Sequence, residues 1–265
     1  EDVASYGPDG FELPDDAVES AEAEAEAAAE LAADSAFGAM EPSSVGELVD
    51  LYLEEQELDP SEEQLVRHAL TSLVEQEYAA DLDELSVLAL VEGEGFDGGD
   101  AVIVGGYLSV VEQLAEGLPI RLRAPVEAVE WGEDGVVLSL QDRDEVVEAD
   151  AVVLTLPLGV LQAAPPEFDP PLPEEKQDAI ERLGMGTLDK VALRFPTAFW
   201  DDTAFVSFVN PEGSHFTEWL NLEPATGEPI LIGFTAGSAA VGLEELSDEQ
   251  VVDQAMDALR SIYED

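Results

Sequence analysis

The chain has 265 residues, of which 46% are hydrophobic, so it can bury a sizeable core and is not expected to be disordered. Its net charge of −53, from 62 acidic and 9 basic residues, disfavours nucleic acid and anionic membranes as partners. The absence of cysteine excludes disulfides, a thiol nucleophile and cysteine-based metal sites.

The carboxylates are interspersed through the chain and are not gathered in one tail, which predicts a folded protein with an acidic surface. At molar salt the Debye length falls to about 3 Å, which screens the repulsion between such charges. We therefore expect a high-salt cytoplasm as its location, and an engineered acidic surface is the alternative. The sequence has no apolar run of about 18 residues and no signal-peptide pattern, and Glu1 in place of Met indicates a trimmed N-terminus.

The N-terminal part is expected to be helical. Residues 16–34 are dominated by Ala and Glu, which predicts a solvated peripheral helix that buries little, with low-complexity disorder as the alternative. Ser43 or Ser44 can cap a helix over residues 45–53.

A stronger start signal is Asp59-Pro60-Ser61-Glu62, which combines an N-cap residue, Pro at the first helical position and Glu three residues after the cap. Apolar residues then recur at helical spacing as far as Val74. His68 lies beside this stripe, and we interpret it as a structural side chain, not as a catalyst or ligand. The glycine-rich residues 93–100 are expected to form a loop that connects two lobes.

The middle of the chain alternates between one short helix and several strands. A helix is expected over residues 108–116, and Gly132 to Gly135 predicts a hairpin turn. The nearly continuous apolar run 151–156 is typical of a strand that is buried on both faces. The alternating patterns predict three further strands over residues 126–131, 136–140 and 146–147.

Five prolines between residues 165 and 173 predict a stiff linker that marks a second lobe boundary. A helix over about 174–183 follows, and the final helix is expected to begin after a capping box at residues 247–250. Strand-like runs between these two helices cover residues 189–195, 205–209, 215–222 and 230–234.

An ordered set of motifs from about residue 78 to the C-terminus resembles the middle of the flavin-dependent amine oxidases. That family includes polyamine oxidases, monoamine oxidases and lysine-specific histone demethylases. The Thr-Leu-Pro-Leu-Gly run alone is weakly specific, whereas the ordered set is a strong signal. The motifs are residues 105–107, 114–122, 125–129, 149–161, 168–176, 184–191, 199–200 and 236–240.

The resemblance implies an α+β or α/β fold, in which part of a Rossmann-like FAD-binding domain is interleaved with a substrate domain of helices and an antiparallel sheet. Residues 1–98 would form the helical part of the substrate domain. Residues 99–163 would belong to the FAD-binding domain, and residues 164–265 would supply the sheet and a helix of the substrate domain.

The resemblance also implies roles for single residues. Val126 falls where the family contacts the adenine end of FAD through backbone groups, and Thr155, Leu156 and Pro157 fall near the flavin pocket. Lys190 matches the active-site lysine that holds a water near flavin N5. Its apolar strand would lower the pKa of its ammonium group by desolvation. A lone ion pair with one of the many carboxylates is the alternative for Lys190.

The strand predicted at residues 215–222 carries three further candidates. Phe216 and Trp219 are expected to line the substrate slot, with ordinary packing in the sheet core as the alternative. His215 is interpreted as a residue of the surface or the rim.

No Gly-x-Gly-x-x-Gly pattern, which supplies a pyrophosphate site at a helix N-terminus, follows a predicted strand. We therefore expect a central fragment that does not hold FAD tightly and is inactive alone. The strand expected at 151–156 would then present an apolar edge, unless missing segments of the same protein or a partner chain in a homo-oligomer cover it.

The expected activity is FAD-dependent oxidation of a small-molecule amine to an imine and then an aldehyde, with hydrogen peroxide as the second product. The alternatives are a non-catalytic binding module with an amine-oxidase-like fold, and a flavoprotein resembling phytoene desaturase or protoporphyrinogen oxidase.

Overall fold

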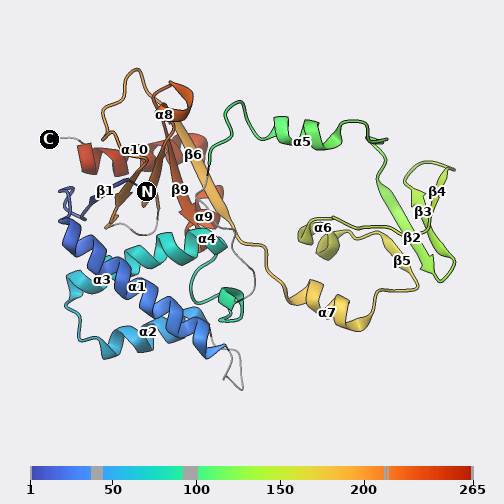
Figure 1. Cartoon of the computed structure of the whole chain (residues 1–265), viewed down its shortest axis with the longest axis horizontal. Coiled ribbons are helices and arrows are strands. Elements are labelled where there is room, and N and C mark those ends of the chain that lie inside the picture. The colour runs from blue at the N-terminus through green and yellow to red at the C-terminus, as the bar shows by residue number, and fades with distance from the viewer. Residues whose placement is uncertain (1, 37–43, 92–100, 212, 214, 264–265) are drawn as a thin grey trace. The chain divides into compact units, whose positions relative to one another are not determined.

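The computed structural model describes residues 2–36, 44–91, 101–211, 213 and 215–263, and these form two compact units (Figure 1). The first unit combines Glu1–Val104 with Gly186–Asp265, and the second is Gly105–Met185. The loop predicted at 93–100 lies outside the described residues. Among the described residues, no helix is both long and apolar enough to cross a membrane.

A five-stranded sheet organises the first unit, and four of its strands were predicted. Its order is β1-β7-β8-β9-β6, with antiparallel pairing except between β1 and β7, which run parallel. The four predicted strands are β6 (Leu188–Arg194), β7 (Phe205–Phe208), β8 (Glu218–Asn221) and β9 (Ile230–Ala236). The edge strand β1 (Val3–Tyr6) was not predicted, because four residues among turn signals show no clear alternation.

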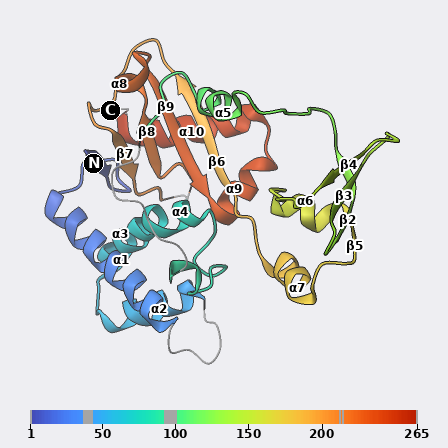
Figure 2. The same ribbon diagram turned by 45° about the vertical axis from the view of Figure 1, so that its right-hand side comes forward.

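One face of this sheet packs against the C-terminal helix α10 (Asp248–Tyr263), as Figure 2 shows. Ser247 and Gln250 form the expected capping interaction, in which each accepts a hydrogen bond from the backbone N–H of the other. The hydroxyl groups of Tyr6 and Tyr263 both donate to Asp201 Oδ2, at 2.7 and 2.8 Å, and so tie β1 to α10. The short helices α8 (Glu223–Thr226) and α9 (Gly237–Glu244) flank β9 in the chain.

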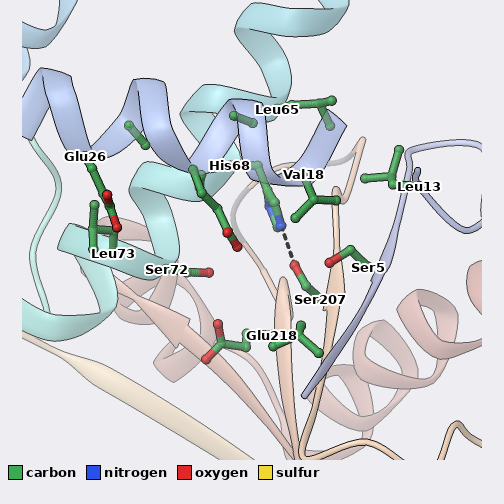
Figure 3. A pocket seen from close by; sticks show the side chains of 15 residues that line it. Ser5, Leu13, Val18, Glu26, Leu65, His68, Ser72, Leu73, Ser207 and Glu218 are labelled. Carbon is green, nitrogen blue, oxygen red and sulfur yellow. Dashed lines mark hydrogen bonds between the residues drawn. The ribbon is translucent and has the colours of Figure 1, made fainter. Parts of the chain in front are cut away.

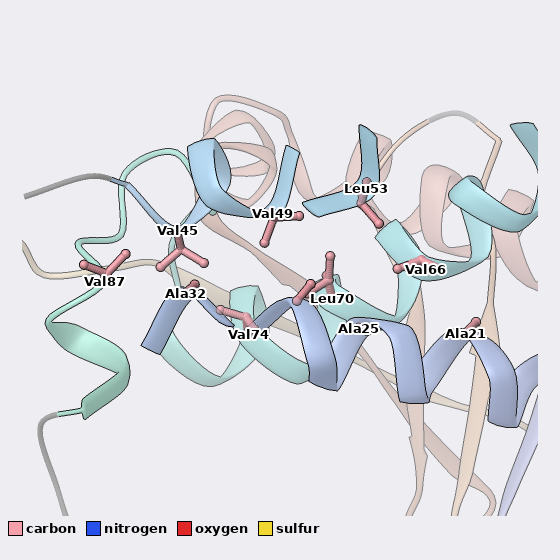
Figure 4. Close-up of a cluster of buried hydrophobic side chains, with 11 residues drawn as sticks. Ala21, Ala25, Ala32, Val45, Val49, Leu53, Val66, Leu70, Val74 and Val87 are labelled. Carbon is pink, nitrogen blue, oxygen red and sulfur yellow. The ribbon is translucent and has the colours of Figure 1, made fainter. Parts of the chain in front are cut away.

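Four Ala side chains of the first helix, α1 (Asp15–Ser35), lie in the centre of a helical layer (Figure 4). They pack with the apolar faces of α2 (Val45–Glu55) and α3 (Pro60–Leu70). The expectation of a peripheral helix that buries little was therefore wrong. Small side chains let neighbouring helices approach closely, so an Ala stripe can form an interface. The buried residues of α1 are Ala21, Ala25, Ala28 and Ala32.

Both predicted helix starts in this layer are confirmed by their hydrogen bonds. Ser44 Oγ accepts from the backbone N–H of Glu47 at the start of α2. Asp59 accepts from the N–H of Glu62 while Glu62 accepts from the N–H of Asp59, which is a complete capping box for α3. The layer continues through the π-helical turn η1 (Thr71–Glu75), α4 (Gln76–Tyr78) and the 3-10 turn η2 (Ala89–Val91).

The second unit contains a four-stranded sheet in the order β4-β3-β2-β5. The predicted hairpin is formed by β2 (Val126–Gly132) and β3 (Gly135–Leu140), with β4 (Val146–Ala149) antiparallel to β3. The helices of this unit are α5 (Leu108–Ala115), α6 (Leu158–Ala163) and α7 (Glu174–Arg182).

The proline-rich segment takes part in this sheet. Within it, β5 (Glu167–Asp169) pairs in parallel with residues 128–130 of β2. The predicted boundary between residues 163 and 164 therefore lies inside the second unit, which continues to Met185. Pro restricts backbone geometry, but three residues between prolines still offer enough backbone groups for an edge strand.

Candidate active site

Lys190 lies on β6, where its backbone position pairs with Phe234 of β9. The side chain of Lys190 is exposed to solvent. Among the described residues, no carboxylate lies within salt-bridge distance of it, which disfavours the alternative of a lone ion pair. Lys190 was expected to be shielded from water, but in the described part of the chain its side chain stays exposed. Successive residues of a strand point to opposite faces, and Lys190 points away from the core packed against the other face.

The pairing registers of four neighbouring strand pairs place Lys190 at one end of a row that crosses the whole sheet. Residues directly opposite each other on paired strands point to the same face. We call these five residues the cross-strand row. In order across the sheet they are Ser5, Ser207, Glu218, Phe234 and Lys190.

The other end of the cross-strand row lines a pocket of about 340 Å³ beneath α1 and α3, which we call the helix-side pocket (Figure 3). Apolar side chains of α1, α3 and the segment before α1 form its walls, among them Leu13, Val18 and Leu65. The polar groups that line it are Ser5, Glu22, Glu26, His68, Ser72, Ser207 and Glu218.

His68 of α3 is the largely buried polar group of this pocket. Its Nε2 atom forms a hydrogen bond of 2.7 Å with Ser207 Oγ, so the side chain is satisfied, as its structural interpretation requires. Burial lowers the pKa of His68 to about 4. His68 is therefore neutral near pH 7 and adds no positive charge beside the carboxylates of Glu22, Glu26 and Glu218.

This lowered pKa of His68 predicts a loss of stability in acid. The folded-state pKa lies below the unfolded value, so the unfolded chain takes up the proton first as the pH falls. Stability is complete above about pH 6.5 and decreases towards pH 4, by up to about 3 kcal/mol. We expect urea unfolding between pH 7.5 and 4.5 to show this loss in the wild type relative to His68→Gln.

The control for His68 is His215→Gln in the same unit, where partial burial lowers the pKa of His215 as well. Because His215 is only half-buried, its substitution is expected to change the pH dependence less than that of His68. A difference between the wild type and His68→Gln that stays constant over this pH range would contradict the prediction.

Phe216 and Trp219 lie apart from Lys190, in the core between the sheet and α10. Trp219 alternates with Glu218 along β8 and therefore points to the face opposite the cross-strand row. Both side chains are almost fully buried, and Trp219 Nε1 donates to the carbonyl oxygen of Phe216 at 3.1 Å. These positions correspond to the packing alternative, and the prediction that the two residues line a substrate slot is corrected accordingly.

The candidate flavin-contacting residues belong to the second unit. Val126 begins β2 at a register shift between Val126 and Ala128. Such an irregularity leaves backbone groups outside the ladder of hydrogen bonds. Thr155, Leu156 and Pro157 lie in an extended segment before α6, where Thr155 and Pro157 are exposed.

The strand predicted at residues 151–156 is not formed in the described structure. Val153 is 85% exposed and Leu154 is 41% exposed, so the expectation of a strand buried on both faces was wrong. An apolar run becomes a central strand only when strands pair with both of its edges. Among the described strands, none pairs with this segment, although its expected apolar exposure is present.

Comparison with known proteins identifies the family of this chain. The family model for flavin containing amine oxidoreductases matches residues 16–265. The chain belongs to this family. It is 37% identical over 188 residues to polyamine oxidase 4 of Oryza sativa subsp. japonica, which covers 71% of this chain and 38% of the relative. It is 34% identical over 177 residues to human lysine-specific histone demethylase 2, covering 64% of this chain and 21% of the relative.

Solved structures of putrescine oxidase share the fold. A triple mutant with redesigned cofactor binding superposes with a TM-score of 0.73 at 18% identity, over 99% of this chain and 64% of that chain. The wild type bound to putrescine gives a TM-score of 0.68. The chain thus spans less than half the length of the curated relatives and about two thirds of the solved ones.

Flavin is the cofactor of this family. The candidate residues of the second unit must therefore offer contacts that suit a flavin. The register shift between Val126 and Ala128 interrupts the regular pairing of β2 with β3, and Thr155 and Pro157 are exposed on either side of the partly buried Leu156. Hydrogen-bonding backbone and apolar surface are the contacts that a planar heterocycle accepts. The chemistry of these residues is compatible with contacts to part of a flavin nucleotide.

Ser5, Ser207 and Glu218 were missed as site residues in the sequence. A detectable signal was present for two of them, because Ser207 interrupts an apolar strand at an alternate position and Glu218 does the same beside Trp219. Their joint position could not be found without the register of β7 and β8, which depends on which strands become neighbours.

Proposed function

We propose that this chain forms part of an enzyme that oxidises an amine with FAD as the hydride acceptor. The observation that carries the proposal is the position of Lys190, exposed on β6 at the end of the cross-strand row and without a salt bridge to any described carboxylate. Membership of the amine oxidoreductase family and 37% identity to a polyamine oxidase support it.

When bound, FAD would supply the redox chemistry, as the acceptor of a hydride from the carbon next to the amine nitrogen, with molecular oxygen as the final electron acceptor. Hydrolysis of the imine product gives an aldehyde and releases ammonia from a primary amine, or the smaller amine from a secondary one, and oxygen is reduced to hydrogen peroxide. Lys190 holds a water molecule at its ammonium group, next to the reacting atoms. The neighbouring Phe234 provides an aromatic wall beside the substrate.

Val126, Thr155, Leu156 and Pro157 are the residues that would contact the flavin nucleotide. We propose that these contacts alone do not hold FAD tightly and that the isolated chain is inactive, since they account for only part of the cofactor. After the chain is mixed with FAD at high salt, gel filtration is expected to separate the two. Flavin absorbance that stays with the protein peak would refute this part of the proposal.

The activity itself is tested on flavin-loaded protein that contains this chain. Anaerobic addition of an amine is expected to bleach the flavin absorbance near 450 nm, and air is expected to restore it with release of hydrogen peroxide. An alcohol of the same carbon skeleton is the control and should leave the spectrum unchanged. A spectrum that no amine bleaches would favour the alternative of a non-catalytic binding module.

The same spectra address the alternative of a flavoprotein that desaturates carbon chains or oxidises porphyrinogens, since such an enzyme would be reduced by those substrates and not by amines. The Leu-Pro-Leu-Gly-Val-Leu run together with Lys190 in its strand favours amine oxidation over that alternative, because both resemble motifs of the amine oxidases.

We also propose a high-salt cytoplasm as the working environment. The support is the charge of −53, together with the exposed position of most carboxylates of α1 and α2.

A further inference from the structure

The loop that follows α4 joins the helical layer to the strand that carries Lys190. The carbonyl oxygen of Ala79 accepts a hydrogen bond of 2.8 Å from the backbone N–H of Thr187, which directly precedes β6. Two residues further along the loop, Asp81 Oδ1 accepts from the backbone N–H of Ser238, in the first turn of α9, at 3.0 Å. We call Ala79, Asp81, Thr187 and Ser238 the Asp81 joint.

Two glycines show how closely the loop approaches the sheet. A Cβ atom on Gly186 would overlap the carbonyl oxygen of Ala79, and a Cβ atom on Gly237 would overlap the carboxylate of Asp81. Gly237 also has a φ of +60°, which residues with a side chain rarely adopt. Its N–H donates to the carbonyl oxygen of Thr187 at 3.0 Å, so the two contacts of the joint are linked directly.

The loop is in turn fixed to the helical layer. The carboxylate of Glu75, in η1, accepts from the backbone N–H of Leu82 at 3.3 Å. The carbonyl oxygen of Leu82 accepts from the N–H of Gly46, in the first turn of α2, at 2.9 Å. Because both sides of the loop are bonded, the helical layer holds the start of β6 in place.

Lys190 depends on this support because β6 is an edge strand. Among the described strands it pairs only with β9, where Lys190 lies opposite Phe234. Thr187 and Gly237 adjoin the end of this pair, three residues from Lys190 and Phe234, which is about 10 Å along a strand. The ends of an edge strand open easily, since few hydrogen bonds hold them. The Asp81 joint supplies an additional anchor at this end.

We propose that the Asp81 joint is a positioning element for Lys190, which fixes the start of β6 so that the ammonium group keeps its place beside the substrate. This inference rests on the proposed function of Lys190. Asp81 contacts neither substrate nor flavin and acts through β6, so it is a positioning residue. A misplacement of about 1 Å at a reaction centre can cost about 10²-fold in rate.

Variants of Asp81 test the joint in flavin-loaded protein that contains this chain. Asp81→Ala is expected to lower the limiting rate of flavin reduction at saturating amine by about tenfold or more. The dissociation constant of the amine should stay unchanged, because the joint does not contact the substrate. Asp81→Asn keeps an acceptor oxygen for Ser238 and should restore most of the rate. Asp81→Leu replaces Asp81→Ala if circular dichroism shows that the latter does not fold.

Three comparisons separate positioning from a general loss of stability. Ser44→Ala removes the side chain that caps α2, and Gly242→Ala adds a methyl group to α9 in open space. Both variants should reduce flavin at the wild-type rate. In the Lys190→Met background, Asp81→Ala should cause no further slowing, because the joint acts through Lys190.

Hydrogen–deuterium exchange of the chain measures the joint without flavin or turnover. Asp81→Ala should speed amide exchange at Thr187 and the first residues of β6, and Ser44→Ala should leave it unchanged. The inference is overturned if this exchange does not respond to Asp81→Ala, if Asp81→Ala reduces flavin as fast as the wild type, or if it slows the Lys190→Met variant equally. Responsive exchange in a protein whose flavin no amine bleaches would reject the proposed function and support the joint as the anchor of β6. Amine oxidation with unresponsive exchange would do the reverse.

Discussion

Replacing Lys190 by Met is expected to slow the reduction of the flavin by an amine about 10²- to 10³-fold, the loss typical of removing one positioned hydrogen-bond donor from a reaction centre. Methionine has a similar length and no charge, so it cannot hold the water next to the reacting atoms. FAD should remain bound, because Lys190 belongs to the first unit and the candidate flavin contacts belong to the second. Anaerobic stopped-flow absorbance of flavin-loaded protein measures both quantities.

The chain offers a matched control for this experiment. Lys176, on α7, is the other lysine of the sequence and is exposed in the second unit. Lys176→Met makes the same chemical change at a position with no part in the cross-strand row, and its rate of flavin reduction should equal that of the wild type. Equal rates for the wild type and Lys190→Met would remove Lys190 from the mechanism.

Salt is expected to stabilise the fold strongly. With 62 acidic and 9 basic residues, repulsion between carboxylates acts over the whole surface at low ionic strength. Raising KCl from 0.1 to 2 M shortens the Debye length from about 10 Å to below 3 Å. A gain of about 5 kcal/mol would raise the Tm by roughly 10–20 °C. Thermal melts followed by circular dichroism at each KCl concentration measure this rise in Tm.

Partial neutralisation of the surface separates screening from general effects of salt on hydrophobic burial. Four exposed glutamates of α1 and α2, outside the helix-side pocket, are changed to Gln: Glu19, Glu30, Glu54 and Glu55. This variant should melt at a higher temperature than the wild type in 0.1 M KCl and should respond less to added salt. A response to salt equal to that of the wild type would point to a cause other than charge repulsion.

The parts of the fold that the sequence predicted well are those fixed by local interactions. The capping box at Asp59 and the hairpin turn at Gly132 to Gly135 depend only on neighbouring residues, and both are present as expected. The strands β6 and β9 were also recognisable, since each is a strand-like run bounded by turn signals and, at seven residues, among the longest strands of the chain's described part. Lys190 was selected through its motif and stays a prediction as a site residue, whereas its place on β6 agrees with the predicted strand.

The features that were predicted wrongly depend on distant partners. The Ala face of α1 is buried only because the apolar faces of α2 and α3 pack against it. The run 151–156 has the composition of a central strand, but composition does not provide the neighbouring strands that such a strand needs. From the sequence, the side chain of Trp219 could have pointed to either face of the sheet. The register of β8 with β9 places it on the face that packs against α10.

The parallel pairing of β1 with β7 has a consequence for the order of folding during synthesis. Val3 pairs with Phe205, so the edge strand must wait for a partner that the ribosome adds roughly 200 residues later. At 5–20 residues per second this interval lasts roughly 10–40 s. The helical layer, with its short-range contacts, and the continuous second unit can both fold within it. The edge strand β1 can therefore join the sheet only after β7 has been synthesised.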